Sequence, residues 1–326
     1  MSGPLYEDAM EFLVLRKLAL TPHTFAANQR CLLSFDRHLE NRGKTEKSVT
    51  EEDVLTWVQP MYGQSSVRTI SSKISFLRIF LAYLREKEIP VYMPPSLKVP
   101  ATYMPYLFSD SELQALFSAA DSFSLREMTH CPVQRMEFPM LIRMLYSCGF
   151  RLGELLSVRT ADIDFSNGVI FIRNGKNKKQ RIVPMPDALT EMLRRYCLAM
   201  NVMGDPDNCV FPSKNPKKPL GQSTVRFWMK MLLNDTGIYV QREAHSRGQC
   251  VHCFRHLFAI KSFAQAQQRL GRSVSASIPY LSDYLGHHSI QETERYLKFS
   301  PDMFPEHTRL FEEYSEGVFP EVCDED

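Results

Sequence analysis

The pattern of apolar and polar positions predicts that the first part of the chain is built from helices. In residues 65–87, apolar side chains recur at intervals of three and four, the spacing that places them on one helix face. Residues 24–42 form a second amphipathic stretch, and Thr50 with Asp53 has the pattern of a capping box that opens another helix. We therefore expect an N-terminal helical domain over residues 1–90.

The polar face of the helix expected over residues 65–87 carries Arg68, Ser72 and Ser75. Such a face is typical of a helix that simply meets solvent. Small and basic side chains also suit a helix that enters a groove of DNA. Both interpretations stay open at this point, and Arg68 and Lys73 are the candidate groove contacts.

A proline-rich segment separates this domain from the rest of the chain. Residues 90–106 contain five prolines, and proline fixes φ and prevents a helix from continuing. We expect a semi-rigid linker over residues 91–106 and a second domain over residues 107–326. Ser109 and Glu112 form a capping-box pattern at the first helix of that second domain.

The second domain is expected to combine helices with a β-hairpin. Residues 168–173 are rich in β-branched and aromatic side chains, residues 174–179 have the composition of a turn, and residues 180–185 form the return strand. Helices are expected before and after the hairpin, over residues 139–148, 152–159 and from 186 onward. The predicted fold class is mainly α with a small β-hairpin or sheet.

The composition of this 326-residue chain is that of a folded protein, because 44% of its residues are apolar. No run of about 18 apolar residues predicts a membrane-spanning helix. The N-terminus lacks the basic start and apolar core of a signal peptide, so we expect a cytoplasmic protein.

Charge is distributed unevenly along the chain. The net charge is only +2, but residues 301–326 hold nine acidic residues and one basic residue, which leaves +10 on the rest. A basic body with an acidic tail is compatible with binding to a polyanion.

The eight cysteines are scattered and are expected to be mostly reduced in the cytoplasm. Cys250 and Cys253 form a CxxC pair close to three histidines, which are His245, His252 and His256. A zinc site is one interpretation of this cluster. A structural zinc ion usually needs four well-spaced ligands, and ligands this crowded would struggle to surround one ion. We therefore predict no metal.

Arg151 follows a glycine at the expected start of a helix, with Glu154 one turn further on. This spacing is typical of an ordinary surface ion pair. An arginine can also use its fork of N–H groups to bind a phosphate, in which case Glu154 would lie buried behind it.

Lys176 lies at the expected tip of the hairpin, where five of nine residues are basic. Many hairpin tips have this character without any special function. A β-ribbon can also enter a DNA groove, and a lysine near other cations can have its pKa lowered enough to donate a proton. The other basic residues of the hairpin are candidate DNA contacts: Arg173, Lys178, Lys179 and Arg181.

Two histidines, an arginine and a tyrosine complete the candidate set. His252 and Arg255 are three residues apart and share one helix face, while His287 follows Gly286, which is expected to end a helix. Tyr296 lies on the next helix. A phenol acts as a nucleophile near neutral pH only when local cations assist its ionisation. Together with the arginine and lysine above, these residues suit the breaking of a phosphodiester without metal or nucleotide.

The chain resembles the tyrosine recombinase, or integrase, family, most of all its Xer-type and transposon-borne members. The resemblance rests on four stretches in the family's order: GFRLGELLSVRTADIDF, VIFIRNGKNKKQRIVPM, HCFRHLFA and YLGHHSIQETERY. It covers the whole second domain, while the helical first domain is more loosely similar to the family's core-binding domain. The nine-residue spacing from His287 to Tyr296 matches the family pattern.

The resemblance implies how the reaction would run. Tyr296 would attack phosphorus to give a 3′-phosphotyrosine and a free 5′-hydroxyl. Arg151 and Arg255 would bind the scissile phosphate, and His287 would help to stabilise its growing charge.

The remaining implied roles concern protons. Lys176 would protonate the leaving 5′ oxygen, and His252 would assist proton transfer at the tyrosine. Because the covalent link keeps the phosphodiester energy, rejoining would need no ATP, metal or other cofactor.

Membership of the family would also imply partners. Two domains would form a C-shaped clamp on double-stranded DNA of a recombination site, and four copies would assemble in a synapse that exchanges strands through a Holliday junction. The tail over residues 301–326 would dock on a neighbouring copy, or else pack on its own domain. Two other functions stay open, a type IB topoisomerase and a DNA-binding regulator that keeps the fold without the chemistry.

Overall fold

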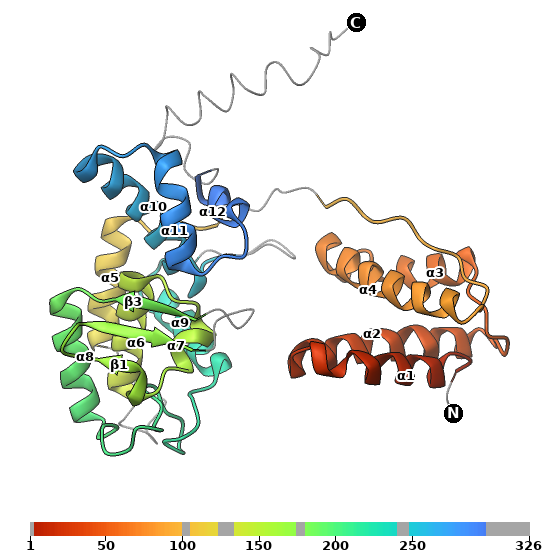
Figure 1. Cartoon of the computed structure of the whole chain (residues 1–326), viewed down its shortest axis with the longest axis horizontal. Helices are drawn as coiled ribbons and strands as arrows, with labels where there is room; N and C mark the ends of the chain where they lie inside the picture. The colour runs from red at the N-terminus through yellow and green to blue at the C-terminus, as the bar shows by residue number, and fades with distance from the viewer. Residues whose placement is uncertain (1–2, 100–104, 123–133, 174–179, 240–247, 298–326) are drawn as a thin grey trace, which may run out of the picture. The chain divides into compact units, whose positions relative to one another are not determined.

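The computed structural model describes residues 3–99, 105–122, 134–173, 180–239 and 248–297. The chain divides into two compact units, Met1–Thr102 and Tyr103–Asp326, each of which is described by itself (Figure 1). Among the described residues, none of the helices combines the length and the apolar character that a bilayer crossing requires.

The first unit consists of helices, as predicted. Its elements are α1 (Tyr6–Arg16), η1 (Lys17–Ala19), α2 (Pro22–Asn41), α3 (Glu51–Val58), η2 (Gln59–Met61) and α4 (Val67–Glu86). The predicted capping box is confirmed, because the Thr50 side chain accepts from the backbone of Asp53 and the Asp53 side chain accepts from the backbone of Thr50. These helices share one core that contains Phe35, Trp57 and Phe80.

Helix α4 has the two faces that its sequence predicts. The apolar stripe is buried, and Ile70, Leu77 and Leu84 are each 0% exposed. Arg68 is exposed on the polar face, while Lys73 is half-buried and its Nζ lies 3.7 Å from a methionine sulfur.

The second unit is α+β, with a three-stranded antiparallel sheet in the order β1-β2-β3. Its elements are α5 (Asp110–Ser122), α6 (Gln134–Cys148), α7 (Leu152–Leu156), η3 (Thr160–Asp162), β1 (Ile163–Asp164), β2 (Val169–Ile172), β3 (Arg181–Pro184), α8 (Asp187–Ala199), α9 (Gln222–Asp235), α10 (His252–Leu270), α11 (Val274–Leu285) and α12 (Ile290–Leu297). The predicted hairpin is confirmed by the pairing of β2 with β3, in which Ile170 faces Val183. The two-residue strand β1 was not predicted, because so short a segment shows no alternation.

Two predicted helix boundaries before the sheet are wrong. Helix α6 begins at Gln134, five residues before Pro139, and contains the proline within it. Helix α7 ends at Leu156 rather than at Arg159, because the chain turns there and the N–H of Val210 bonds to the carbonyl of Val158.

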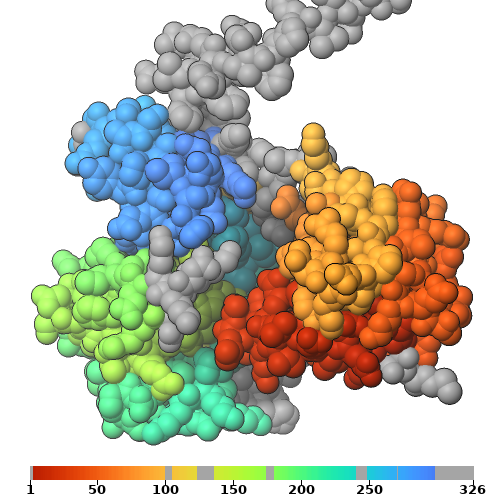
Figure 2. Space-filling view, turned by 45° about the vertical axis from the view of Figure 1, so that its right-hand side comes forward, coloured from red at the N-terminus to blue at the C-terminus, as the bar shows by residue number. Residues whose placement is uncertain are grey.

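Helices α10, α11 and α12 pack together around a small core of their own. Figure 2 shows these three helices, in blue, against the green part of the same unit that contains the sheet. Gly286 ends α11 as predicted, with the left-handed φ of 64° that glycine adopts without strain. Gly149 allows a close approach to α10, because a Cβ at this position would lie 2.4 Å from the ring of Phe258.

Candidate active site

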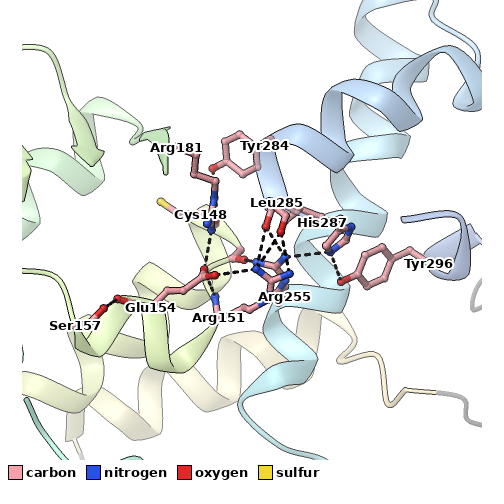
Figure 3. Close-up of polar contacts among 12 residues, drawn as sticks. Cys148, Arg151, Glu154, Ser157, Arg181, Arg255, Tyr284, Leu285, His287 and Tyr296 are labelled. Carbon is pink, nitrogen blue, oxygen red and sulfur yellow. Dashed lines mark hydrogen bonds and ion pairs between the residues drawn. The ribbon is translucent and has the colours of Figure 1, made fainter. Parts of the chain in front are cut away.

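Arg151 lies directly before α7, where it meets the end of α11. Its guanidinium donates to the carboxylate of Glu154 at 2.8 Å and to the carbonyl oxygen of Gly286 at 3.2 Å. The side chain keeps 21% of its surface exposed. The loop that follows α11 therefore holds Arg151 in place while part of its guanidinium stays accessible (Figure 3).

Glu154 lies between two arginines, because Arg181 of β3 donates to its second carboxylate oxygen, also at 2.8 Å. The Glu154 side chain is only 5% exposed, as expected for a residue behind Arg151. Burial acts to raise the pKa of Glu154, but the hydrogen bonds and charges of Arg181 and Arg151 outweigh it and lower the pKa to about 2. Glu154 is therefore ionised near neutral pH and ties Arg151 to the sheet.

Arg255 is the most buried cation of the site, with 1% of its surface exposed. It donates to the carbonyl oxygens of Gly149 and Leu285, both at 2.7 Å, and its Nη2 lies 3.1 Å from Nε2 of His287. Burial lowers the pKa of Arg255 to about 10, so the guanidinium remains charged near neutral pH. The carbonyl oxygens of Leu285, at the end of α11, and of Gly149 therefore orient the Arg255 guanidinium through hydrogen bonds.

His287 and Tyr296 come together beside Arg255. The Tyr296 hydroxyl lies 3.5 Å from Nε2 of His287, and the two rings stack with centroids 5.6 Å apart. The other ring nitrogen of His287, Nδ1, lies 2.6 Å from the hydroxyl of Thr293. Tyr296 is 5% exposed and His287 is 6% exposed. The Tyr296 hydroxyl points toward His287 and Arg255 (Figure 3).

A second histidine, His256, contacts both His252 and the ring of Tyr296. His252 is the first residue of α10, is exposed, and its ring centroid lies 4.7 Å from that of His256. The ring of His256 in turn lies 5.2 Å from the ring of Tyr296. His256 thus packs directly on the candidate nucleophile.

Of the six predicted reactive residues, the structure brings together Arg151, Arg255, His287 and Tyr296, with His252 at their edge. Lys176, Lys178 and Lys179 lie outside the described residues. Arg173 has 62% of its side chain exposed and forms an ion pair with Asp162. Arg181 was predicted as a candidate DNA contact, but its side chain is 10% exposed and pairs with Glu154.

Sequence reasoning missed three features of the site. Thr293 was not singled out, although its place one helical turn before Tyr296 is a signal that it shares that face. The pairing of Arg181 with Glu154 joins positions 27 residues apart, and no local spacing predicts it. The carbonyl oxygens that hold the arginines are backbone groups, which side-chain motifs do not show.

The zinc interpretation of the CxxC segment finds no ligand set in the part of the chain that the structure describes. There, no group of three or more histidine, cysteine or acidic side chains is arranged to hold a metal ion. The sulfurs of Cys250 and Cys253 lie 3.8 Å apart, and His245 lies outside the described residues.

The site unites two guanidinium groups, an imidazole and a phenol in a largely water-excluded setting. Guanidinium groups match the geometry and charge of a phosphate oxygen pair. A phosphodiester bound by Arg151 and Arg255 would lie beside the Tyr296 hydroxyl. The arrangement therefore suits attack of a phenol oxygen on phosphorus.

The Glu154 pair predicts how stability responds to acid. The pKa of Glu154 falls from 4.5 to about 2 on folding, which corresponds to about 3 kcal/mol of stability above pH 4.5. This contribution is lost as the pH falls from 4.5 toward 2. Because Glu154→Gln never carries the charge, we expect it to lower the free energy of unfolding at pH 7 and to show a smaller further fall between pH 5 and pH 3. Urea unfolding at several pH values measures both effects.

Glu191 provides a matched control for this measurement, because it pairs with Arg195 at the surface and is 51% exposed. An exposed pair contributes little, so Glu191→Gln should change stability by less than about 1 kcal/mol. Equal effects of the two substitutions at pH 7 would contradict the role given to Glu154.

The chain matches two family models, one in each unit. Residues 108–302 match the family model "Phage integrase family". Residues 11–88 match "Phage integrase, N-terminal SAM-like domain".

Individual relatives cover most of the chain. A putative integrase/recombinase of Sinorhizobium fredii is 29% identical over 298 residues, which are 87% of this chain and 90% of that protein. The tyrosine recombinase XerC of Staphylococcus aureus is 27% identical over 286 residues, which are 85% of this chain and 86% of XerC.

Two solved structures share the fold. XerH site-specific recombinase bound to its difH substrate has a TM-score of 0.64 at 17% identity, over 86% of this chain and 78% of that one. The Tn1549 transposon integrase in complex with a circular-intermediate DNA has a TM-score of 0.66 at 16% identity, over 91% of this chain and 95% of that one.

Proposed function

The chain belongs to the phage integrase family, the tyrosine recombinases that cut and rejoin DNA, and we propose that Tyr296 is the nucleophile of this reaction. In the proposed step the Tyr296 oxygen bonds to phosphorus and the bond from phosphorus to the 5′ oxygen breaks. The product is a 3′-phosphotyrosine and a 5′-hydroxyl. Attack by a 5′-hydroxyl of a second strand reverses the step and completes recombination.

One observation carries this assignment. The hydroxyl of Tyr296 lies 3.5 Å from Nε2 of His287, and this nitrogen lies 3.1 Å from the guanidinium of Arg255. A chain of contacts thus links the candidate nucleophile to the candidate phosphate-binding group. Among the tyrosines that the structure describes, Tyr296 is the one whose hydroxyl contacts the arginine-histidine cluster in this way.

Arg151 and Arg255 supply the positive charge that the reaction requires. Negative charge grows on the non-bridging phosphate oxygens as the phenol attacks, and fixed cations in a water-excluded site stabilise it strongly. Both guanidinium groups are already held by backbone carbonyls, so little reorganisation is needed when phosphate binds. The roles of proton donor to the 5′ oxygen and of helper at the tyrosine fall to Lys176 and His252.

We propose double-stranded DNA of a specific recombination site as the partner. Of the two solved structures named above, one holds the difH substrate and the other a circular-intermediate DNA, and the N-terminal unit matches the family's SAM-like domain. The candidate contacts are the exposed Arg68 and Arg173, with Lys73, Lys178 and Lys179. Assembly of four copies on paired sites and a location in the bacterial cytoplasm belong to the same proposal.

A covalent-adduct assay tests the function as a whole. Purified protein is mixed with nicked duplexes taken from the DNA that flanks its own gene, in buffer with a metal chelator, and separated on a denaturing gel. A slower band that joins protein to DNA supports the proposal. Relaxation of supercoiled plasmids that lack any such site would indicate a topoisomerase instead, while binding without any adduct would indicate a regulator.

The acidic tail predicts a separate effect on assembly. Residues 301–326, which lie outside the described residues, carry a net charge of −8 and several aromatic side chains. We propose that this tail docks on a neighbouring copy. Removal of residues 301–326 should reduce recombination between two sites by at least about tenfold, the effect of 1.4 kcal/mol, while binding to a single site changes little. Gel-shift and two-site recombination assays measure the two quantities, and unchanged recombination would refute the role.

A further inference from the structure

Thr293 is a fully buried hydroxyl that no role described above explains. It is 0% exposed and lies on α12, three residues before Tyr296. Its Oγ1 lies 2.6 Å from Nδ1 of His287. The hydrogen bond that one ring nitrogen of a histidine makes helps to set which of the two nitrogens carries the proton.

The neighbours of His287 determine which of its ring nitrogens carries a hydrogen. A guanidinium group donates hydrogen bonds and never accepts them, so Nε2 of His287, 3.1 Å from Nη2 of Arg255, must be the acceptor. A neutral imidazole then carries its one hydrogen on Nδ1, and this N–H donates to the Oγ1 of Thr293.

The charge state of His287 agrees with this assignment. Burial, followed by the charges of Arg255, Arg151 and Arg181, lowers the pKa of His287 to about 3. The imidazole of the DNA-free protein is therefore neutral near pH 7 and has one N–H to place.

We propose that Thr293 is a positioning residue, which accepts the Nδ1–H of His287 and so holds the imidazole in the tautomer whose Nε2 faces Tyr296 as an acceptor. This inference rests on the proposed role of Tyr296. In the reaction, the phenolic proton moves to Nε2 of His287, a transfer that His252 assists, as the bond from oxygen to phosphorus forms and the bond to the 5′ oxygen breaks. The imidazolium that results donates the same N–H to a phosphate oxygen, and the separate proton on the 5′ oxygen comes from a general acid.

Two variants separate the hydroxyl of Thr293 from its packing. Thr293→Val keeps the shape and removes the acceptor, and Thr293→Ser keeps the acceptor. By analogy with metal-binding histidines, whose orienting hydrogen bonds are worth 10- to 100-fold, we expect the rate of adduct formation to fall by about tenfold to a hundredfold in Thr293→Val. The rate of adduct formation in Thr293→Ser should stay within about threefold of the wild type. The serine hydroxyl can accept the same hydrogen bond, which restores most of the 10- to 100-fold effect.

The tautomer itself is measured without DNA. Long-range ¹H–¹⁵N correlation spectra of protein labelled with ¹⁵N-histidine resolve the two nitrogens of each of the nine histidines, and His287→Gln identifies the signals of His287. We expect a protonated Nδ1 and an unprotonated Nε2 in the wild type and in Thr293→Ser. In Thr293→Val we expect a detectable fraction of the other tautomer.

Three results would overturn the role of Thr293. They are an Nε2–H tautomer in the wild type, a Thr293→Val protein with the wild-type rate and spectrum, and a Thr293→Ser protein as slow as Thr293→Val. Failure of the proposed function would give a different result, because wild-type protein would then form no adduct at all. The tautomer measurement needs no DNA and would still test the role of Thr293.

Discussion

Replacing Tyr296 by phenylalanine should abolish the covalent link to DNA and leave DNA binding intact. The substitution removes one oxygen atom, and this oxygen is the proposed attacking atom. The ring that stacks on His287 and His256 stays in place, so the fold of α12 should be retained. We expect the adduct to fall below detection on a denaturing gel, at least about 10³-fold, as for other enzymes that lose an essential catalytic group. A gel-shift assay on the same duplex should give an affinity within about threefold of the wild type, well under 1.4 kcal/mol.

Tyr280 offers a matched control for this experiment. It lies on α11 in the same unit and is 66% exposed, so Tyr280→Phe also removes a single hydroxyl. Its adduct formation should equal that of the wild type. A covalent band that survives in Tyr296→Phe would assign the nucleophile to another residue.

Removing Arg255 should have the second largest effect, because this side chain contributes to phosphate binding, to the orientation of the site and to its positive charge. Arg255→Ala removes a cation from the proposed phosphate site, deprives the carbonyl oxygen of Gly149 of its donor, and leaves that of Leu285 with only the longer bond from Arg151 at 3.4 Å. Loss of one such electrostatic group typically lowers the rate by 10²- to 10³-fold. Each buried carbonyl that loses its partner costs about 1–3 kcal/mol of stability. Single-turnover adduct formation and urea unfolding measure the two losses.

Arg255→Lys separates charge from geometry. Lysine keeps the positive charge but cannot donate to two carbonyl oxygens and an imidazole with one planar fork. We expect Arg255→Lys to fold better than Arg255→Ala and still to react at least about tenfold slower than the wild type, the effect of 1.4 kcal/mol. Arg195→Ala, which removes a side chain that is 78% exposed, serves as the control. Cleavage by folded Arg255→Ala at a rate close to the wild type would exclude the proposed role.

The parts of the fold that the sequence predicted are those with a local signature. The stripe in α4 repeats at helical spacing, the capping box at Thr50 is four residues long, and β2 and β3 are short runs rich in β-branched side chains that lie close together in the sequence. In each case neighbours along the chain decide the structure. Features of this kind can be recognised in one sequence.

The parts that were not predicted depend on contacts between distant segments. Helix α6 continues through Pro139 because tertiary packing outweighs the local preference of proline, and Phe138 beside it is 1% exposed. Arg181 points to Glu154 rather than to open solvent because a buried carboxylate needs a second donor. The candidate site was found because its reactive residue types form an ordered motif, whereas Thr293 supports the site through a contact that only the folded chain creates.

The bond between Glu154 and Arg181 has a consequence for how such chains diverge. Removing one partner of a buried ion pair usually costs 3–5 kcal/mol, whereas replacing both together can be nearly neutral. A lineage can therefore change either position only by passing through a poorly stable intermediate or by changing both at once. Exposed residues such as Arg68 have no such restraint. New DNA specificities can arise on these surfaces through single substitutions, while the carboxylate that supports the phosphate-binding arginine is inherited with its partner as a unit.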